Sequence, residues 1–389
     1  KLLSKNFKGD LICALAETVK VLKGSYALMA ICEGNNSIAV AKYRSSVILG
    51  YGENEYFCAS DEPALAGKCK EICVLDDGDI ACITPDGIEI YNGNLQRIIR
   101  EKKPNTGAEQ SLDLGGYPHY MLKELHEIPV AVENTAKAFE GVSAKLKSAL
   151  NGVDRIILVG CGTAYHAGLA GKRYFEQFAR VPAECDTAGE FRYKNPVITE
   201  RTAVFAVSQS GETADTVEAA RLARGLGAKV IAVTNVLNSA LTRIADVTVP
   251  VSAGPEICVA ATKSYIGQIT ALYLCAVGFA KNGSNGNCAF ADGLEAMPKL
   301  CKKTLAQVNT YSLANMCALS SGVYFLGRDI DYAVALEGSL KLKEVSYIHS
   351  EGYPAGELKH GTLALIDENA VAVALIFDET LAGKTVCAV

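Results

Sequence analysis

The sequence lacks the features that mark several large classes of protein. It has no long basic run and a net charge of −5 over 389 residues, which argues against a nucleic-acid-binding surface. Its longest apolar stretch, 370–377, is far shorter than the roughly 20 residues that a membrane span needs. Neither G-x-G-x-x-G nor G-x-x-x-x-G-K-[ST] occurs, so a dinucleotide or nucleoside triphosphate ligand is not expected.

Cysteine is plentiful, but it is not arranged for disulfides or for a metal. The 14 cysteines are scattered, and only Cys69 and Cys73 lie close together, with no histidine nearby. Scattered buried thiols are typical of a cytosolic protein. No leader pattern is present. We therefore expect a cytoplasmic location, no metal and no cofactor.

The first 95 residues have the pattern of an antiparallel sheet with one helix. Apolar residues recur at helical spacing over 9–22, which predicts an amphipathic helix. Short β-rich runs follow, and turn signals such as D-D-G-D and P-D-G between them favour antiparallel hairpins. We assign this unit to 1–95. The polar stretch 96–117 contains K-K-P-N-T-G and L-G-G-Y and is predicted to be a linker.

From residue 118 onward, apolar strands alternate with helices, which is typical of a parallel sheet covered on both faces. We place the first such unit at 118–290. The pattern restarts at V-Y-F-L-G, ending at Gly327, which resembles I-I-L-V-G, ending at Gly160. Each run opens a polar turn into a helix, so we predict a duplicated α/β unit whose second copy, 291–389, is truncated.

The stretch V-S-Q-S-G-E-T-A-D-T at 207–216 follows an apolar strand directly. Ligands of open parallel sheets bind beyond the carboxyl ends of the strands. Hydroxyl groups beside the free N–H groups of a helix start can hold a phosphate without any cation. The same residues can be ordinary helix caps. Spacing alone leaves both interpretations open.

A second polar cluster extends from Glu337 to His360. Glu337, Lys341 and Glu344 share one face of a predicted helix. That face is either a solvated stripe of ion pairs or part of a site for sugar-phosphate chemistry. Of the five histidines we select only His360, which lies between glycines in a loop. We interpret the other four, His166 among them, as structural or surface residues.

Several motifs resemble those of the glucosamine-6-phosphate synthase family, the isomerizing glutamine–fructose-6-phosphate aminotransferases. They are S-Q-S-G-E-T-A-D-T, C-G-T-A-Y, G-E-F-R-Y, A-T-K, A-L-E-G-S-L-K-L-K-E-V-S-Y-I-H and G-E-L-K-H-G-T-L-A-L-I. H-Y-M-L-K-E-L at 119–125 resembles the family's domain junction, and A-S-D-E-P-A-L at 59–65 resembles the later part of its glutaminase domain. The resemblance covers nearly the whole chain. It implies two sugar isomerase (SIS) domains after an α+β antiparallel remnant of an N-terminal-nucleophile glutaminase domain.

The resemblance also implies a reaction and its substrates. Glutamine is hydrolysed, and its ammonia passes to a site where fructose 6-phosphate is opened, aminated and isomerised to glucosamine 6-phosphate. A homodimer is implied as well. The residues implied to bind substrate are Thr163, Ser208, Gln209, Ser210, Thr213 and the backbone of Val259 and Ala260. Glu344 would move the proton between C1 and C2, Lys341 would support the sugar end, and His360 would assist ring opening at a neighbouring subunit.

Departures from the family pattern temper this expectation. Residue 1 is Lys, where the family's mature chain begins with its nucleophilic cysteine, and the family's Schiff-base lysine falls beyond Val389. The sequence also has no Trp, which the family uses to gate ammonia transfer. We expect a piece truncated at both ends that binds fructose 6-phosphate with little or no synthase turnover. The alternatives are an SIS phosphosugar isomerase or deglycase without glutaminase activity, and a non-catalytic sugar-phosphate-binding protein.

Overall fold

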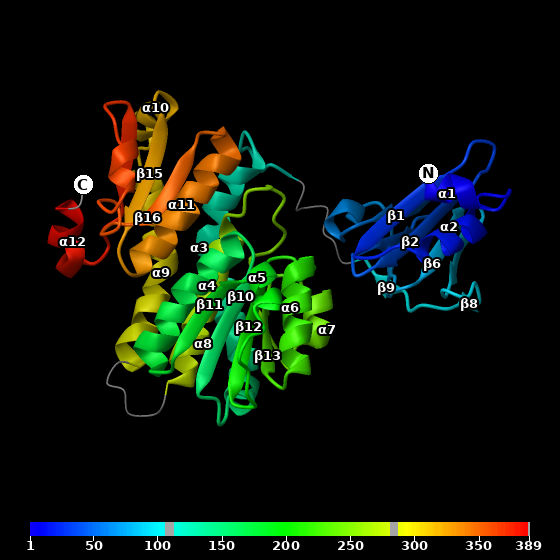
Figure 1. Ribbon diagram of the computed structural model, residues 1–389, viewed down its shortest axis with the longest axis horizontal. Helices are drawn as coiled ribbons and strands as arrows, with labels where there is room; N and C mark the ends of the chain where they lie inside the picture. Colours follow the sequence, from blue (N-terminus) through cyan, green and yellow to red (C-terminus); the bar gives the residue numbers. More distant parts are fainter. Residues whose placement is uncertain (106–112, 281–286, 388–389) are drawn as a thin grey trace. The chain divides into compact units, whose positions relative to one another are not determined.

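The computed structural model describes residues 1–105, 113–280 and 287–387, and it divides the chain into two compact units (Figure 1). The first is Lys1–Asp113 and the second Leu114–Val389. Among the described residues, no helix is long and apolar enough to cross a membrane.

The first unit is built from two antiparallel sheets, as its hairpin turns predict. Its helices are α1 (Leu2–Asn6), α2 (Leu11–Val19) and the short η1 (Pro63–Leu65). Its strands are β1 (Tyr26–Ile31), β2 (Ile38–Tyr43), β3 (Ile48–Tyr51), β4 (Tyr56–Ala59), β5 (Glu71–Val74), β6 (Ile80–Thr84), β7 (Gly87–Tyr91), β8 (Arg97–Ile98) and β9 (Lys103–Pro104). The sheet orders are β1-β2-β6-β7-β8 and β4-β3-β5-β9.

Side-chain alternation along the strands lets each sheet of this unit bury both faces. In β3, Ile48 and Leu49 point to opposite faces. Leu49 joins a core shared by both sheets, together with Val40 and Leu75. On the outer face of the first sheet, Leu15 of α2 packs against β2 and β6. The result is one helical layer and two stacked sheets.

Two short strands lie within the segment 96–117 that we predict to be a linker. β8 pairs with β7, and β9 pairs with β5, so both extend the sheets of the first unit. Each has only two residues, too few for an alternating pattern to reveal it in the sequence. Residues 106–112 of the predicted linker lie outside the described residues.

The second unit begins with a five-stranded parallel sheet in the order β11-β10-β12-β13-β14. Its strands are β10 (Arg155–Gly160), β11 (Ala183–Thr187), β12 (Thr202–Ser208), β13 (Lys229–Thr234) and β14 (Val247–Pro250). Its helices are α3 (Tyr120–Ala149), α4 (Thr163–Tyr174) with the π-helical turn η3 (Phe175–Ala179), α5 (Ala188–Tyr193), α6 (Ala214–Gly225), α7 (Ala240–Ile244) and α8 (Lys263–Phe279).

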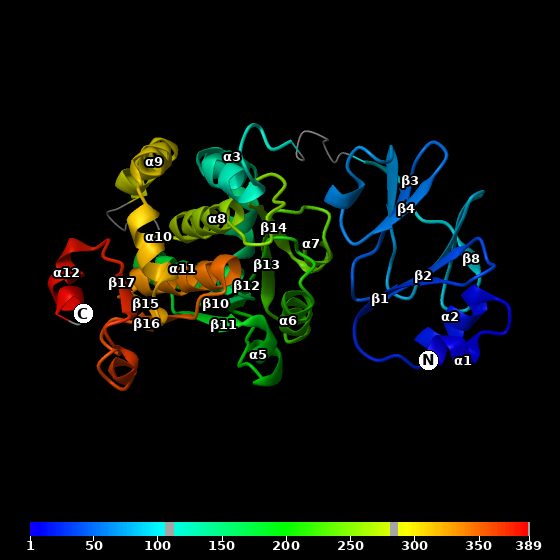
Figure 2. The same ribbon diagram turned by 90° about the horizontal axis from the view of Figure 1, so that it is seen from above.

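Helices cover both faces of this sheet, which explains why its strands are apolar throughout (Figure 2). Leu158 and Phe205 face α3, α4 and α8, whereas Ile157 and Val204 face α5, α6 and α7. The sequence-based prediction of a parallel α/β sheet is confirmed.

A second parallel sheet, in the order β16-β15-β17, follows two further helices. Its elements and those around it are α9 (Asn287–Gln307), α10 (Tyr311–Ala318), β15 (Gly322–Gly327), α11 (Ile330–Ser346), β16 (Ser350–Pro354), η4 (Thr362–Leu365), β17 (Ala370–Ala374) and α12 (Glu379–Val386). The segment before β15 thus forms two helices, with a break near Asn309, whose side chain accepts from the N–H of Tyr311. Helix α11 packs against α4, so the two α/β sheets meet through these helices.

Candidate functional site

The hydroxyl-rich stretch forms the turn between β12 and α6. Ser208 is the last residue of the buried strand, and its Oγ lies 3.0 Å from Oγ1 of Thr213. The N–H of Gly211 donates to Ser208 Oγ at 3.0 Å, and the N–H of Glu212 donates to Ser210 Oγ at 3.2 Å. The side chains therefore gather at the carboxyl edge of the sheet, as the sequence predicts.

Glycine is required at position 211 of this turn. Its φ is +66°, and a Cβ there would lie 2.1 Å from the Oγ of Ser239, which belongs to the neighbouring loop. The carbonyl of Gln209 accepts from the N–H of Asn235 at 3.1 Å and from Thr234 Oγ1 at 3.3 Å. These contacts hold the turn against the end of β13.

The start of α6 has no side-chain cap. Thr213 is the residue before the helix, and its side chain makes no capping hydrogen bond. The first-turn N–H groups are not used by intrahelical bonds and carry the positive end of the helix dipole. Ser208 and Ser210 do stabilise the turn itself, as the capping interpretation holds. The uncapped helix start still leaves room for the phosphate interpretation.

A second cluster forms where α11 crosses α4. The Oγ1 of Thr163 donates to Glu337 Oε1 at 2.9 Å, and Lys341 Nζ donates to Thr163 Oγ1 at 3.1 Å. Lys341 also lies 2.6 Å from Glu344 Oε2 and 3.4 Å from Glu337 Oε1. Thr163, Lys341 and Glu344, all chosen from the sequence, are thus brought together from segments far apart in the chain.

Sequence reasoning missed the centre of this cluster. The Glu337 side chain is only 5% exposed, and its Oε2 lies 2.7 Å from Nδ1 of His166. We placed Glu337 on the same helical face as Lys341 and Glu344 but did not choose it, and we interpreted His166 as a structural or surface residue. The available signal was that His166 follows Thr163 by three residues, which places both on one face of α4.

A buried tyrosine of α8, Tyr265, is close enough to Glu337 to be influenced by its charge. Burial and, to a smaller extent, the charge of Glu337 raise the pKa of Tyr265 far above its usual range. Its hydroxyl has no hydrogen-bond partner among the described residues.

The remaining candidates lie in two loops. Val259 is 99% exposed and Ala260 is buried, in the loop between β14 and α8. His360 is exposed in the turn after β16, where its N–H donates to the carbonyl of Glu357 at 3.0 Å. Within the described ranges, no hydrogen bond or ion pair joins the His360 ring to the cluster. Its role stays a prediction.

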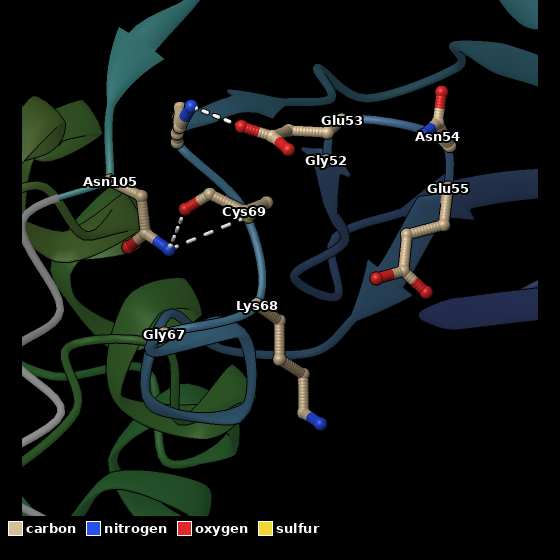
Figure 3. A pocket seen from close by; sticks show the side chains of 9 residues that line it. Gly52, Glu53, Asn54, Glu55, Gly67, Lys68, Cys69 and Asn105 are labelled. Carbon is tan, nitrogen blue, oxygen red and sulfur yellow. Dashed lines mark hydrogen bonds and ion pairs between the residues drawn. The ribbon is translucent and has the colours of Figure 1, made fainter.

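The first unit contains a cavity of about 830 Å³ at the surface (Figure 3). Lys70 pairs with Glu53 at 2.5 Å, and Asn105 Nδ2 donates to the carbonyls of Leu65 and Cys69 at 2.8 and 3.0 Å. These polar groups bind one another, and none of them was a candidate from the sequence. We assign this cavity no function.

The second unit thus combines two parallel sheets, a hydroxyl-rich strand end and a cluster of ionisable side chains where α4 meets α11. The SIS domain family matches residues 149–278 and 320–385, one segment in each α/β sheet region. The chain belongs to the SIS-domain family.

Within that family, the curated relatives are isomerizing glutamine–fructose-6-phosphate aminotransferases. The chain is 43% identical to the one from Clostridium tetani over 98% of its own length and 65% of the relative's. It is 43% identical to that of Aquifex aeolicus over 96% of its own length and 63% of the relative's. The resemblance predicted from the motifs is confirmed. The chain spans about 65% of the length of these relatives.

Solved structures support the same grouping. The C-terminal domain of glucosamine-fructose-6-phosphate aminotransferase from Francisella tularensis is 36% identical, with a TM-score of 0.64. That match covers 71% of this chain and 81% of the solved one. A phosphosugar isomerase from Silicibacter pomeroyi is 25% identical, with a TM-score of 0.60 over 68% of this chain and 80% of the other.

Proposed function

We propose that the chain binds fructose 6-phosphate as its part in the glutamine-dependent formation of glucosamine 6-phosphate. The observation that carries this proposal is the Thr163–Glu337–Lys341–Glu344 cluster, which lies in the same compact unit, residues 114–389, as the uncapped helix start at Thr213. The helix start at Thr213 can bind the phosphate, and the side-chain cluster can transfer protons on the sugar. The similar aminotransferases supply the substrate class.

The phosphate is assigned to the turn before α6. Ser208, Ser210 and Thr213 supply hydroxyl groups, Gln209 supplies its side-chain amide, and the helix start supplies N–H groups. At the sugar end, Thr163 and the backbone of Val259 and Ala260 are the proposed contacts.

Proton transfer is assigned to the face of α11. Glu344, 34% exposed at the open end of the cluster, is the base that moves the proton between C1 and C2. Lys341, 2.6 Å away, offsets the charge of that carboxylate when it is ionised and supports the sugar. His360 assists ring opening, and in this proposal it serves the neighbouring subunit of a homodimer.

The rest of the proposal concerns organisation. Residues 1–95 form the later part of a glutaminase domain, followed by a linker at 96–117. The SIS domains occupy 118–290 and 291–389. We also propose that the protein is cytoplasmic and uses no cofactor, with glutamine as the second substrate.

Calorimetric titration of the chain with fructose 6-phosphate, glucosamine 6-phosphate and unphosphorylated fructose tests the proposal. We expect binding of both phosphates and not of fructose. Thr213→Val should weaken both by about tenfold, the loss of one good contact. The matched control is Thr380→Val, an exposed threonine at the start of α12, which should change nothing. Equal binding of fructose would contradict the phosphate assignment.

A second experiment separates an enzyme from a sugar-phosphate-binding protein. Glu344→Gln keeps the shape of the side chain and removes its ability to accept a proton. In a full-length version, we expect formation of glucosamine 6-phosphate to fall at least about a hundredfold, with fructose 6-phosphate affinity nearly unchanged. Retained activity would argue against Glu344 as the base.

A further inference from the structure

The loop between β14 and α8, residues 251–262, has no regular secondary structure but is held at three places. Its beginning is bound by the side chain of Asn235. The Nδ2 of Asn235 donates to the carbonyl of Gly254 at 2.7 Å, and its Oδ1 accepts from the N–H of Ala253 at 2.8 Å.

The end of the loop is held by Glu256, which caps α8 from within the loop. Its Oε1 accepts from the N–H groups of Thr262 and Ser264 at 2.9 and 3.1 Å. Its Oε2 accepts from Ser264 Oγ at 2.5 Å. Thr262, the residue before the helix, makes no capping bond of its own, so the carboxylate takes that place.

The middle of the loop is held from another helix. Glu124 lies in the second turn of α3, and its side chain is buried, with 2% of the residue exposed. Its Oε1 accepts from the N–H of Ile257 at 2.6 Å and from the N–H of Cys258 at 3.1 Å. These two residues directly precede Val259 and Ala260.

We propose that Glu124 is a positioning residue, which holds the backbone of Val259 and Ala260 where it meets the sugar. This inference rests on the proposed function, which assigns that backbone to the sugar. Hydrogen bonds from N–H groups to a carboxylate are shorter and stronger than neutral ones, so one side chain fixes two consecutive peptide units. In this proposal the stretch H-Y-M-L-K-E-L-H-E at 119–127, which resembles a domain junction, also holds a loop of the second unit in place.

Fold stability alone does not explain a carboxylate at this position. The Oε2 of Glu124 is buried and has no partner among the described residues. Burying such a group is unfavourable, and an apolar side chain would serve packing better. An ion pair follows on the same face of α3, where Glu127 Oε2 lies 2.5 Å from Nζ of the buried Lys263. The Glu124 hydrogen bonds and the Glu127 ion pair therefore connect α3 to the loop and to the first residue of α8.

Three variants of the full chain test the proposal. Glu124→Ala removes the oxygen that accepts from both N–H groups. Glu124→Gln keeps an amide oxygen for the two N–H groups. Glu133→Ala removes an exposed carboxylate of the same helix, whose partner is Lys137, and serves as the matched control. Hydrogen exchange at 257–258 measures how firmly the loop backbone is held. Calorimetry with fructose 6-phosphate and with inorganic phosphate measures the affinity of the site.

In Glu124→Ala we expect exchange at Ile257 and Cys258 to rise about tenfold and fructose 6-phosphate affinity to fall about tenfold. Affinity for inorganic phosphate should not change, because the loop serves the sugar, whereas general damage to the fold would weaken both ligands. Glu124→Gln should fall between Glu124→Ala and the parent chain, because its neutral amide oxygen still accepts but binds more weakly than a carboxylate. Glu133→Ala should behave like the parent chain. Unchanged exchange, or raised exchange with unchanged sugar affinity, would overturn the proposal. If the parent chain binds no sugar phosphate, the proposed function fails instead, and the exchange data alone decide whether Glu124 holds the loop.

Discussion

At the scale of single residues, the site is organised by Glu337. It joins Thr163 and His166 of α4 to Lys341 of its own helix, through contacts of 2.9, 2.7 and 3.4 Å. A buried carboxylate is tolerated when both oxygens are bound. These contacts connect α4 to α11, and Lys341 also pairs with Glu344.

His166→Ala tests this arrangement, because it leaves Glu337 Oε2 without its partner. We expect the free energy of unfolding to fall by about 1–3 kcal/mol, the usual cost of an unsatisfied buried polar group. Fructose 6-phosphate affinity should also fall, because Thr163 and Lys341 are anchored on the same carboxylate. Chemical denaturation and calorimetric titration measure the two effects.

The matched control is His349→Ala. His349 also pairs with a carboxylate, Glu351 at 3.1 Å, but its side chain is 64% exposed. Exposed pairs contribute about 0–1 kcal/mol, and neither stability nor sugar binding should change much. Equal effects of the two variants would show that burial of the His166–Glu337 pair has no special importance.

At the scale of elements, the two strand–turn–helix units repeat each other in backbone detail. Gly162, before α4, has φ 53° and ψ −123°, and Asp329, before α11, has φ 54° and ψ −121°. Each strand ends in a glycine over which the next helix passes. A Cβ on Gly160 would lie 2.8 Å from the carbonyl carbon of Ala164, and one on Gly327 would lie 2.3 Å from that of Asp331. The duplication suggested by the sequence is therefore present in the turns.

The two turns differ because one holds glycine and the other holds aspartate in the same positive-φ conformation. Such a conformation costs a non-glycine residue about 1–3 kcal/mol. Asp329→Gly should therefore raise the free energy of unfolding by about 1 kcal/mol, even though it removes an exposed pair with Arg173 at 2.7 Å. Gly162→Ala should lower it by about 1–3 kcal/mol. Chemical denaturation measures both.

Steric clashes and loss of charge can be separated from backbone strain in this comparison. A Cβ on Gly162 would meet nothing closer than Leu340 Cδ2 at 3.9 Å, so only the backbone is strained. Asp329→Ala removes the charge and keeps the Cβ, so it should bring no gain in stability. If Asp329→Ala stabilises the chain as much as Asp329→Gly does, then charge rather than backbone strain explains the effect.

At the scale of the whole molecule, the chain consists of two units with separate cores. The core between the two sheets of the first unit includes Leu49 and Leu75, and the large core of the second includes Leu158 and Phe205. Units with their own cores can unfold as separate cooperative transitions. The proposed sugar-phosphate site lies wholly in the second unit.

We therefore predict that fructose 6-phosphate stabilises one transition only. At a hundred times its dissociation constant, a ligand stabilises the unit that binds it by about 2.7 kcal/mol. In differential scanning calorimetry, the transition temperature of residues 114–389 should rise, and that of residues 1–113 should not change. Hydrogen exchange during heating assigns the transitions, and fructose is the control. A rise in the first unit alone would contradict the placement of the site.

Local patterns in the sequence determined much of this protein. Apolar strands alternating with helices predicted the parallel sheet, and turn signals predicted the antiparallel hairpins. Residues 207–216 marked the strand end, and helical spacing placed Lys341 and Glu344 on one face. These properties depend on neighbours within a few residues, so they are visible in sequence order.

Only the tertiary structure decided which distant residues meet. It divided the strands of the first unit between two sheets and added β8 and β9 to them. It brought His166 to Glu337 and Glu124 to the N–H groups of Ile257 and Cys258. Such pairings depend on how helices pack on a sheet, and the hydrophobic periodicity of the sequence does not predict them. The packed fold brings these partners together from segments far apart in the chain, and a buried carboxylate such as Glu337 is stable only where it meets them.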